Sequence, residues 1–333
     1  MLFQPAIIAL LLASAVCVAA MAVAAPFALE VIRRWDSASG SERQLVLERR
    51  TYLFSTLIAF VLWTQFAALL LFVFNADKMS VMFVGAMCAV GTLNVNAYGF
   101  PALFAQMLVF FLAAGWLAIN YVDNRAPDYP LVRIKYVLLL GLLPLLAASF
   151  ALQLRYFLGL KADVITSCCG SLFSGDAKTV AGEASAIAPL PAMALLYGTV
   201  AFAVVAAGRQ AIGKRGGYLT AASGVAALVA GIVGVLSFVS LYVYEHPHHH
   251  CPFCVLKPDY GFQGYGLYLP LFAATAAAIG AGAVQPFAQV ASLREVAPSV
   301  SARLAAVAAA GFTLFALVGT FMVLHSNLIL VER

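Results

Sequence analysis

Long apolar runs separated by short polar stretches make up almost the whole chain. Each run reaches the roughly 20 residues that a helix needs to cross the hydrocarbon core of a bilayer. The pattern predicts eight membrane-spanning helices, near residues 5–29, 52–76, 100–121, 136–154, 187–208, 217–243, 264–290 and 305–327. Because the loops between them are short, we expect consecutive helices to be antiparallel neighbours in one bundle, an all-α polytopic membrane domain over residues 1–333.

The region from residue 79 to residue 122 has two interpretations. It carries no charge and is too long for one helix. Its first half is rich in residues that break helices and form turns, namely Gly85, Gly91, Asn94, Asn96, Gly99 and Pro101. We therefore predict a short re-entrant or interfacial segment near residues 79–99, followed by one span, in preference to two spans.

The distribution of positive charge supports the eight-span topology. Only 10% of the residues are charged, against about a quarter in soluble domains, and the mean hydropathy is +0.97. With eight spans and an outside N-terminus, most of the 19 Lys and Arg residues fall on one face. A ninth span in the region 79–122 would divide them almost equally. The positive-inside rule thus predicts that both termini lie on the non-cytoplasmic side, which is the periplasmic side if the membrane is a bacterial inner membrane.

Two further features of the chain bear on its class. The first apolar segment ends in small residues (VAAMAVAAPF), as a signal peptide does, but it lacks a basic start and is longer than usual, so we expect a retained helix. The net charge of +5 comes from basic residues in short loops, not from a patch. Nucleic-acid binding is therefore not expected.

The stretch EHPHHHCPFC, residues 245–254, carries the strongest chemical motif. Cys251 and Cys254 have the CxxC spacing that lets two sulfur atoms reach one metal ion or close a small disulfide. Four imidazoles precede them, from His246, His248, His249 and His250. Neutral imidazoles bind metal, and protonated ones stabilise a thiolate. The alternative is one stabilising disulfide beside solvated histidines. Val255 argues against covalent c-type haem, and the lack of a second CxxC argues against a zinc finger.

The remaining cysteines and one histidine complete the candidate set. Cys168 and Cys169 are adjacent, and adjacent cysteines rarely bridge each other, so they are candidates for binding a soft ion or exchanging with a disulfide. Alternatively, one is inert and the other pairs with Cys88 or Cys251. Cys88 is ambiguous by itself, Cys17 is assigned to packing, and His325 is either an interfacial residue or a ligand.

The predicted topology places these candidates on one face. Apart from Cys17, they lie in the outer loops 77–99, 155–186 and 244–263, or at the outer end of the last span. We expect the loop of Cys168 and Cys169 to lie against the loop of Cys251 and Cys254. A string of aromatic residues follows the CxxC, at Tyr260, Phe262, Tyr265 and Tyr268. They are typical of an aromatic belt at the headgroup level, with a quinone-binding wall as the alternative.

Several classes of function lack their usual residues. No Asp, Glu, Lys or Arg falls at the centre of a predicted span, where proton pumps and ion-coupled transporters need one. The inner loops contain no phosphate-binding glycine pattern, and the chain shows no internal repeat. We therefore expect the chemistry at the outer face.

Two short motifs resemble those of known membrane proteins. The fragment SCCG resembles the paired cysteines of mercury-uptake membrane proteins. The outer-face CPFC with additional cysteines is similar to the plan of the membrane disulfide oxidases, including the vitamin K epoxide reductase-like family. Both families have fewer spans, and neither accounts for HPHHH.

Three hypotheses follow from the sequence. The first is a Cys/His site for a transition metal, with copper or zinc preferred and iron as a third candidate, serving metal handling or electron transfer. The second is a thiol–disulfide relay between an extracytoplasmic partner and membrane quinone. The third is an accessory subunit of a larger respiratory complex in the lipid membrane, with structural disulfides. We favour metal because it uses both residue types, and the partner would then be a metal-carrier or redox protein. The sequence assigns no enzymatic activity.

Overall fold

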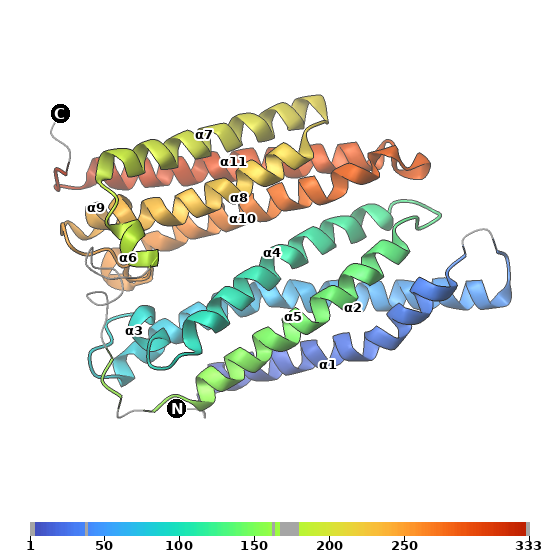
Figure 1. Ribbon diagram of the computed structural model, residues 1–333, viewed down its shortest axis with the longest axis horizontal. Coiled ribbons are helices and arrows are strands. Elements are labelled where there is room, and N and C mark those ends of the chain that lie inside the picture. The colour runs from blue at the N-terminus through green and yellow to red at the C-terminus, as the bar shows by residue number, and fades with distance from the viewer. Residues whose placement is uncertain (1–3, 37–38, 162–163, 167–179, 331–333) are drawn as a thin grey trace. The chain divides into compact units, whose positions relative to one another are not determined.

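The computed structural model describes residues 4–36, 39–161, 164–166 and 180–330, and the regular secondary structure in these ranges is helical (Figure 1). No β-strand occurs in these ranges. Eight helical segments among them are long and apolar enough to cross a membrane: Pro5–Arg34, Glu42–Met82, Gly99–Asp123, Val132–Leu158, Pro189–Gly213, Gly217–Tyr244, Gln263–Gln289 and Val296–His325. The prediction of eight helices of membrane-spanning length is therefore confirmed, and these apolar helices indicate an integral membrane protein.

The first half of the chain contains four long helices and one short one. These are α1 (Pro5–Arg34), α2 (Glu42–Lys78), α3 (Ala89–Leu93), α4 (Gly99–Asp123) and α5 (Val132–Leu158), with a 3₁₀ turn, η1 (Met79–Met82), after α2. The predicted short helix between the second and third spans is α3, which has five residues. The described chain between Met82 and Gly99 thus contains this short helix and turns instead of a ninth span.

The second half contains the other four spans. Its elements are α6 (Val180–Ser185), α7 (Pro189–Gly213), α8 (Gly217–Gly234), the π-helical turn η2 (Val235–Val239), α9 (Ser240–Tyr244), the 3₁₀ turns η3 (Cys254–Leu256) and η4 (Pro258–Tyr260), α10 (Gln263–Val284), the 3₁₀ turns η5 (Gln285–Gln289) and η6 (Ala291–Leu293), and α11 (Val296–His325). Helices α8 and α9 form one continuous span through η2. The HPHHHCPFC stretch follows directly after α9.

The contacts within the chain define two compact units. Unit 1 comprises residues 1–73, 96–160 and 280–301, and unit 2 comprises residues 74–95, 161–279 and 302–333. In unit 1, α5 packs against both α1 and α4. Aromatic side chains join these helices: the Phe27 ring stacks on Phe54 at 4.4 Å and meets Tyr136 edge-on at 5.7 Å. Cys17 belongs to this apolar core, as its assignment to packing predicts.

A buried ion pair joins α4 to α5 in unit 1. The Nζ atom of Lys135 lies 2.8 Å from Oδ2 of Asp123, and both side chains are fully buried. Lys135 also donates to Oδ1 of Asn120 at 3.1 Å, and the other oxygen of Asp123 accepts the backbone N–H of Leu131. These charges lie at helix ends rather than in the middle of a span, as the sequence predicts. A paired and hydrogen-bonded charge of this kind fixes the α4–α5 turn.

In unit 2, the span of α8 and α9 is the most enclosed of the eight, because 72% of the residues in its most apolar 18-residue stretch are buried. Glycines allow its neighbours to approach closely. A Cβ atom on Gly234 would lie 2.1 Å from Leu196 of α7, and one on Gly224 would lie 2.6 Å from Ala278 of α10. Small residues at such contacts are typical of helices packed inside a membrane. The loop that contains the histidines and cysteines follows the C-terminal end of this enclosed span.

Candidate metal centre

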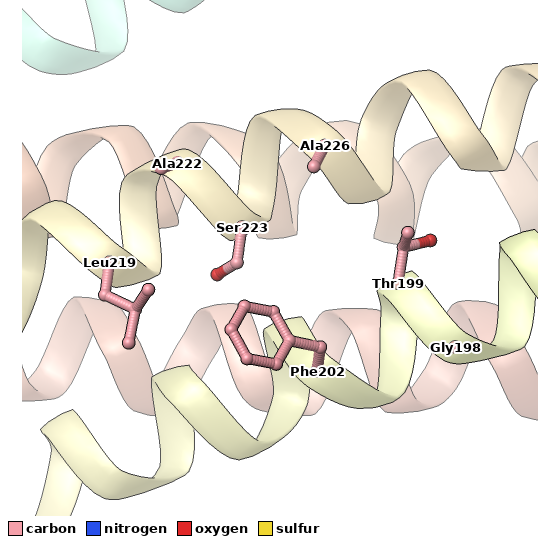
Figure 2. Close-up of a pocket in the computed structure, with 7 residues that line it drawn as sticks. All are labelled: Gly198, Thr199, Phe202, Leu219, Ala222, Ser223 and Ala226. Atoms are coloured by element: carbon pink, nitrogen blue, oxygen red, sulfur yellow. The ribbon is translucent and has the colours of Figure 1, made fainter.

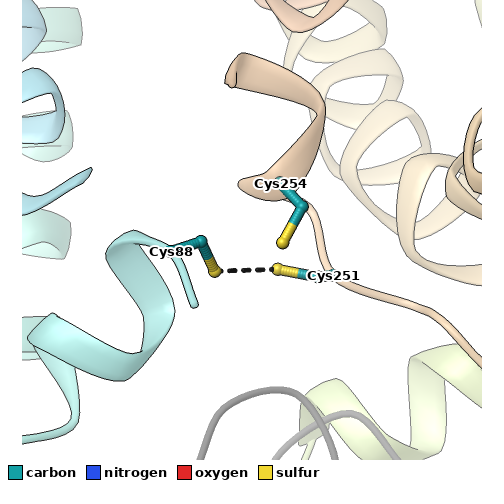
Figure 3. Close-up of side chains that lie close together, drawn as sticks. All are labelled: Cys88, Cys251 and Cys254. Atoms are coloured by element: carbon teal, nitrogen blue, oxygen red, sulfur yellow. Dashed lines mark hydrogen bonds between the residues drawn. The ribbon is translucent and has the colours of Figure 1, made fainter. Parts of the chain in front are cut away.

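Three cysteines meet within unit 2. The Sγ atoms of Cys88, Cys251 and Cys254 all lie within 4.8 Å of one another (Figure 3). Cys88 precedes α3, Cys251 lies in the loop after α9, and Cys254 begins η3. Their side chains are 0–4% exposed. Cys88, which the sequence left ambiguous, thus lies beside the two cysteines of the CxxC motif.

The contacts among these three cysteines are not disulfide bonds. None of them forms a disulfide with another described cysteine. The Sγ atoms of Cys88 and Cys251 are 3.4 Å apart, which is a hydrogen-bonding contact and far longer than the roughly 2.0 Å of an S–S bond. The dashed line in Figure 3 marks this contact.

Thr166 holds the segment that carries Cys88, residues 84–91. The backbone N–H of Thr166 donates to the carbonyl of Val84 at 3.0 Å, and its hydroxyl donates to the carbonyl of Gly91 at 2.9 Å. Gly85 makes this approach possible, because its φ of +87° is unfavourable for other residues and a Cβ atom would lie 2.1 Å from the Thr166 carbonyl oxygen. Cys88 is therefore fixed on both sides along the chain.

Two tyrosines hold the backbone of the CPFC segment. The Tyr244 hydroxyl donates to the carbonyl of Cys251 at 2.5 Å, and the Tyr268 hydroxyl donates to the carbonyl of Pro252 at 2.7 Å. The backbone N–H of Lys257 donates to the carbonyl of Cys254 at 3.0 Å and closes the turn. The Lys257 ammonium also donates to the carbonyl of Met87, next to Cys88. The two cysteine-bearing segments are thus tied together as well as packed.

These supporting residues were not predicted. The sequence suggested an aromatic belt at Tyr260, Phe262, Tyr265 and Tyr268, and Tyr268 instead holds a carbonyl beside Cys251. Tyr244, Lys257 and Thr166 gave no signal, because each acts through a hydrogen bond to a backbone carbonyl. Gly85 was recognised in advance as a turn-forming residue, although its backbone conformation was not predicted.

The histidines lie outside the cysteine cluster and fall into two groups by exposure. The residues whose ligand atoms are mutually close are cysteines, and no histidine belongs to that group among the described residues. His246, His248 and His325 are exposed, whereas His249 and His250 are half-buried. His325 packs its ring on Phe321 of its own helix, with centroids 3.9 Å apart. Cys168 and Cys169, with the predicted contact between their loop and the CPFC loop, lie outside the described residues.

The half-buried histidines have defined surroundings. Nδ1 of His250 lies 2.8 Å from the carbonyl oxygen of Leu236 in η2. A carbonyl can only accept, so Nδ1 donates in this contact, and in that tautomer the lone pair is on Nε2. His249 lies against the Tyr244 ring, with centroids 4.2 Å apart. Burial lowers the pKa of His249 below its ordinary value, with His246 and His250 acting in the same direction and Cys88 opposing them. The ring is therefore neutral at neutral pH, which is the form that binds metal.

A groove of about 360 Å³ lies between α7 and α8, apart from the motif residues (Figure 2). Phe202, Leu219 and Ala226 are among its lining residues. Its two hydroxyls are bonded to their own helices: Thr199 donates to the Leu195 carbonyl at 2.7 Å, and Ser223 donates to the Thr220 carbonyl at 3.1 Å. The groove therefore suits a hydrocarbon chain better than the polar headgroup of a quinone.

The fold and the cluster together define the class of protein. The chain is a helical protein of the integral-membrane type, and its unit 2 carries three buried, mutually close cysteines that could hold a metal ion. Comparisons with protein-family models, with curated proteins and with solved structures gave no match. The assignment of function therefore depends on the chemistry of the cluster.

Proposed function

We propose that Cys88, Cys251 and Cys254 bind one thiophilic metal ion, Cu(I) or Zn(II), and that the protein handles this metal at the non-cytoplasmic face of a bacterial inner membrane. The observation that carries the proposal is the approach of the three Sγ atoms to within 4.8 Å. Three sulfur atoms bound to one ion at about 2.3 Å lie about 3.8–4.0 Å apart. The cluster can adopt this spacing with small side-chain movements.

The donor set favours a soft or borderline ion. Thiolates select Cu(I), Zn(II) and iron–sulfur centres, whereas hard ions such as Mg²⁺ and Ca²⁺ prefer oxygen. Burial adds to this preference, because thiolates in an apolar site are costly unless a cation compensates their charge. The hydrogen bonds to the carbonyls of Cys251, Pro252 and Met87 support the site as outer-shell contacts do around known metal centres.

Counting spans supports the placement of the site. Four spans separate Cys88 from Cys251, so the two segments emerge on the same face. The connections on the opposite face hold most of the basic residues, including Arg33, Arg125 and Arg215. The positive-inside rule makes that opposite face cytoplasmic. An antiparallel order of spans and an interfacial or re-entrant position for residues 79–99 belong to the same proposal.

A thiol–disulfide relay is the second candidate, and the Cys88–Cys251 contact favours it. At 3.4 Å, these two sulfur atoms need only a small movement and a two-electron oxidant to form a disulfide. Cys254 would then be the third thiol that can exchange with it. The quinone partner and an extracytoplasmic thiol protein belong to this alternative, as does membership of a larger membrane complex.

Metal analysis separates the two candidates. The protein is purified in detergent through a tag without histidine, reduced, loaded anaerobically with Cu(I) or Zn(II), and desalted. We expect about one tightly held ion per chain. We further expect its loss in each of Cys88→Ser, Cys251→Ser and Cys254→Ser. Cys17→Ala is the matched control, because Cys17 is a buried thiol of unit 1 and should not change the metal content. Failure of the wild type to retain metal, together with a Cys88–Cys251 disulfide in the isolated protein, would favour the relay.

A further inference from the structure

The HPHHH stretch presents its imidazoles at different depths. His246 and His248 are exposed, His249 and His250 are half-buried, and Cys251 is fully buried. Within one short segment, the side chains therefore range from exposed imidazoles to a fully buried cysteine. The sequence predicted a single site of histidines and cysteines. In the structure, the two residue types differ in exposure.

The loop that carries the histidines is anchored at both ends. At its start, the Glu245 carboxylate accepts the backbone N–H and the side-chain amide of Asn327, each at 2.9 Å. At its end, the Tyr244 hydroxyl holds the carbonyl of Cys251. The backbone N–H of His249 also donates to the carbonyl of His246 at 3.3 Å. The exposed imidazoles are thus presented from a defined position beside the cluster.

The two exposed rings can share an ion. Their centroids are 6.1 Å apart. Two imidazoles bound to one ion at about 2.0 Å have centroids about 5–6 Å apart, so a small rotation suffices. Nδ1 of His246 accepts a long bond, 3.3 Å, from the backbone N–H of His248, and an ion bound there must displace it. An exposed site with two nitrogen ligands and a competing hydrogen bond binds weakly and exchanges quickly.

The half-buried rings of His249 and His250 lie between the exposed pair and Cys251 along the chain. His249 lies on the ring of Tyr244, the residue that holds Cys251. His250 has its Nδ1–H committed to the Leu236 carbonyl, so its Nε2 lone pair can accept an ion. The π-helical turn that contains Leu236 is a local irregularity of a kind often found at functional sites.

We infer that His246 and His248 capture the metal ion from solution and pass it, through His249 and His250, to the thiols of Cys88, Cys251 and Cys254. The inference rests on the proposed metal site. Between the histidines, one nitrogen–metal bond forms as another breaks. In the final transfer, each sulfur–metal bond that forms replaces a nitrogen–metal bond, and the thiol proton leaves to solvent. No electrons are transferred. The gain from weak nitrogen ligation to three sulfur ligands drives the ion inward.

Loading kinetics test this route. Reduced, metal-free protein is mixed anaerobically with a limiting amount of Cu(I) as its acetonitrile complex, and the thiolate-to-copper charge-transfer absorption is followed by stopped flow. We expect the double variant His246→Ala/His248→Ala to load about tenfold more slowly. Its final stoichiometry and its affinity for Cu(I), measured by competition with a chromophoric chelator, should match the wild type. His325→Ala is the control, because His325 is an exposed imidazole on α11 outside the loop.

The outcomes separate the inference from the proposal that it rests on. Equal loading rates in the double variant and the wild type would overturn the capture route, as would equal slowing in His325→Ala. Loss of one bound ion per chain in the double variant would also overturn it, since the histidines would then form a permanent site of their own. A wild type that binds no Cu(I) would overturn both the capture route and the proposed metal site.

Discussion

The Tyr244 and Tyr268 hydroxyls hold the backbone of the CPFC segment by hydrogen bonds. They donate to the carbonyls of Cys251 and Pro252, and they come from α9 and α10, on either side of the CPFC loop. Outer-shell hydrogen bonds of this kind hold ligands in position before the ion arrives. The position of Cys251 therefore depends on residues outside the proposed ligand set.

Tyr268→Phe tests this dependence. The substitution keeps the ring and removes the hydroxyl, so we expect a loss of about 1 kcal/mol of stability. We also expect about tenfold weaker binding of Cu(I) or Zn(II), measured by chelator competition. Tyr197→Phe is the matched control, because the Tyr197 hydroxyl pairs with that of Thr320 at 3.0 Å within the same unit. Similar affinity losses in both variants would mean that the effect is general to the fold and not specific to the CPFC backbone.

At the residue scale, the sequence indicated the clustered cysteines better than the residues that support them. The CxxC spacing identified Cys251 and Cys254 directly. Cys88 was only a candidate, since a lone cysteine among apolar residues carries no information about which distant segment it will meet. Tyr268 resembled an interfacial aromatic residue because its hydrogen-bond partner is a main-chain carbonyl, which has no sequence signature. The exposure that distinguishes His246 from His250 depends on tertiary packing and is equally invisible in the pattern.

At the element scale, the turn between η1 and α3 decides where Cys88 lies. Its shape depends on Gly85, whose backbone is in the left-handed region and against the Thr166 carbonyl. The segment around Thr166 pairs with it on both sides of that glycine, at Val84 and at Gly91. This turn is the connection between the second and third spans.

Gly85→Ala should disrupt this turn. The added Cβ would meet the Thr166 oxygen at 2.1 Å, and the φ of +87° is unfavourable for alanine. We expect a loss of about 2–3 kcal/mol, seen as a lower melting temperature in detergent, and weaker metal binding. Gly141→Ala is the control in α5, where nothing lies within 4 Å of the added atom. That change should be neutral or stabilise the helix by up to about 1 kcal/mol. Unchanged stability and metal binding in Gly85→Ala would show that the turn does not position Cys88.

The helices themselves were predictable because a single requirement, about 20 apolar residues in a row, decides each of them. The turn-forming residues near Gly85 and Asn94 also indicated correctly that the region after α2 holds a short helix before the next span. The π-helical turn at Val235–Val239 was not predictable, since its residues are as apolar as those of the helix around it. Its Leu236 carbonyl accepts from His250, a contact that only the fold reveals.

At the scale of the whole molecule, the number of spans fixes the relation between the termini. Eight is an even number, so if each apolar helix crosses the membrane once, both ends of the described chain lie on one face, and the proposal places the segments of Cys88 and Cys251 on that face too. Nothing in this argument depends on the metal. It depends on each apolar helix crossing once.

Reporter fusions test this topology. A reporter that is active only in the periplasm should be active when fused after residue 330 or within residues 255–262. It should be inactive when fused at residues 124–131 or 214–216, in the connections that carry Arg125 and Arg215. Fluorescent-protein fusions, which require the cytoplasm, should give the opposite pattern. Activity of the periplasmic reporter at residues 214–216 would contradict the orientation derived from the positive charges.

The central claim is that Cys88, Cys251 and Cys254 bind one ion together, and X-ray absorption spectroscopy of the metal-loaded protein tests it most directly. We predict a first shell dominated by sulfur at about 2.3 Å from the metal. The Cys88→Ser variant should show a smaller sulfur contribution or no bound metal, although Cys88 is 163 residues from Cys251 in the chain. A first shell of nitrogen and oxygen alone in the wild type, or an unchanged sulfur shell in Cys88→Ser, would contradict the account.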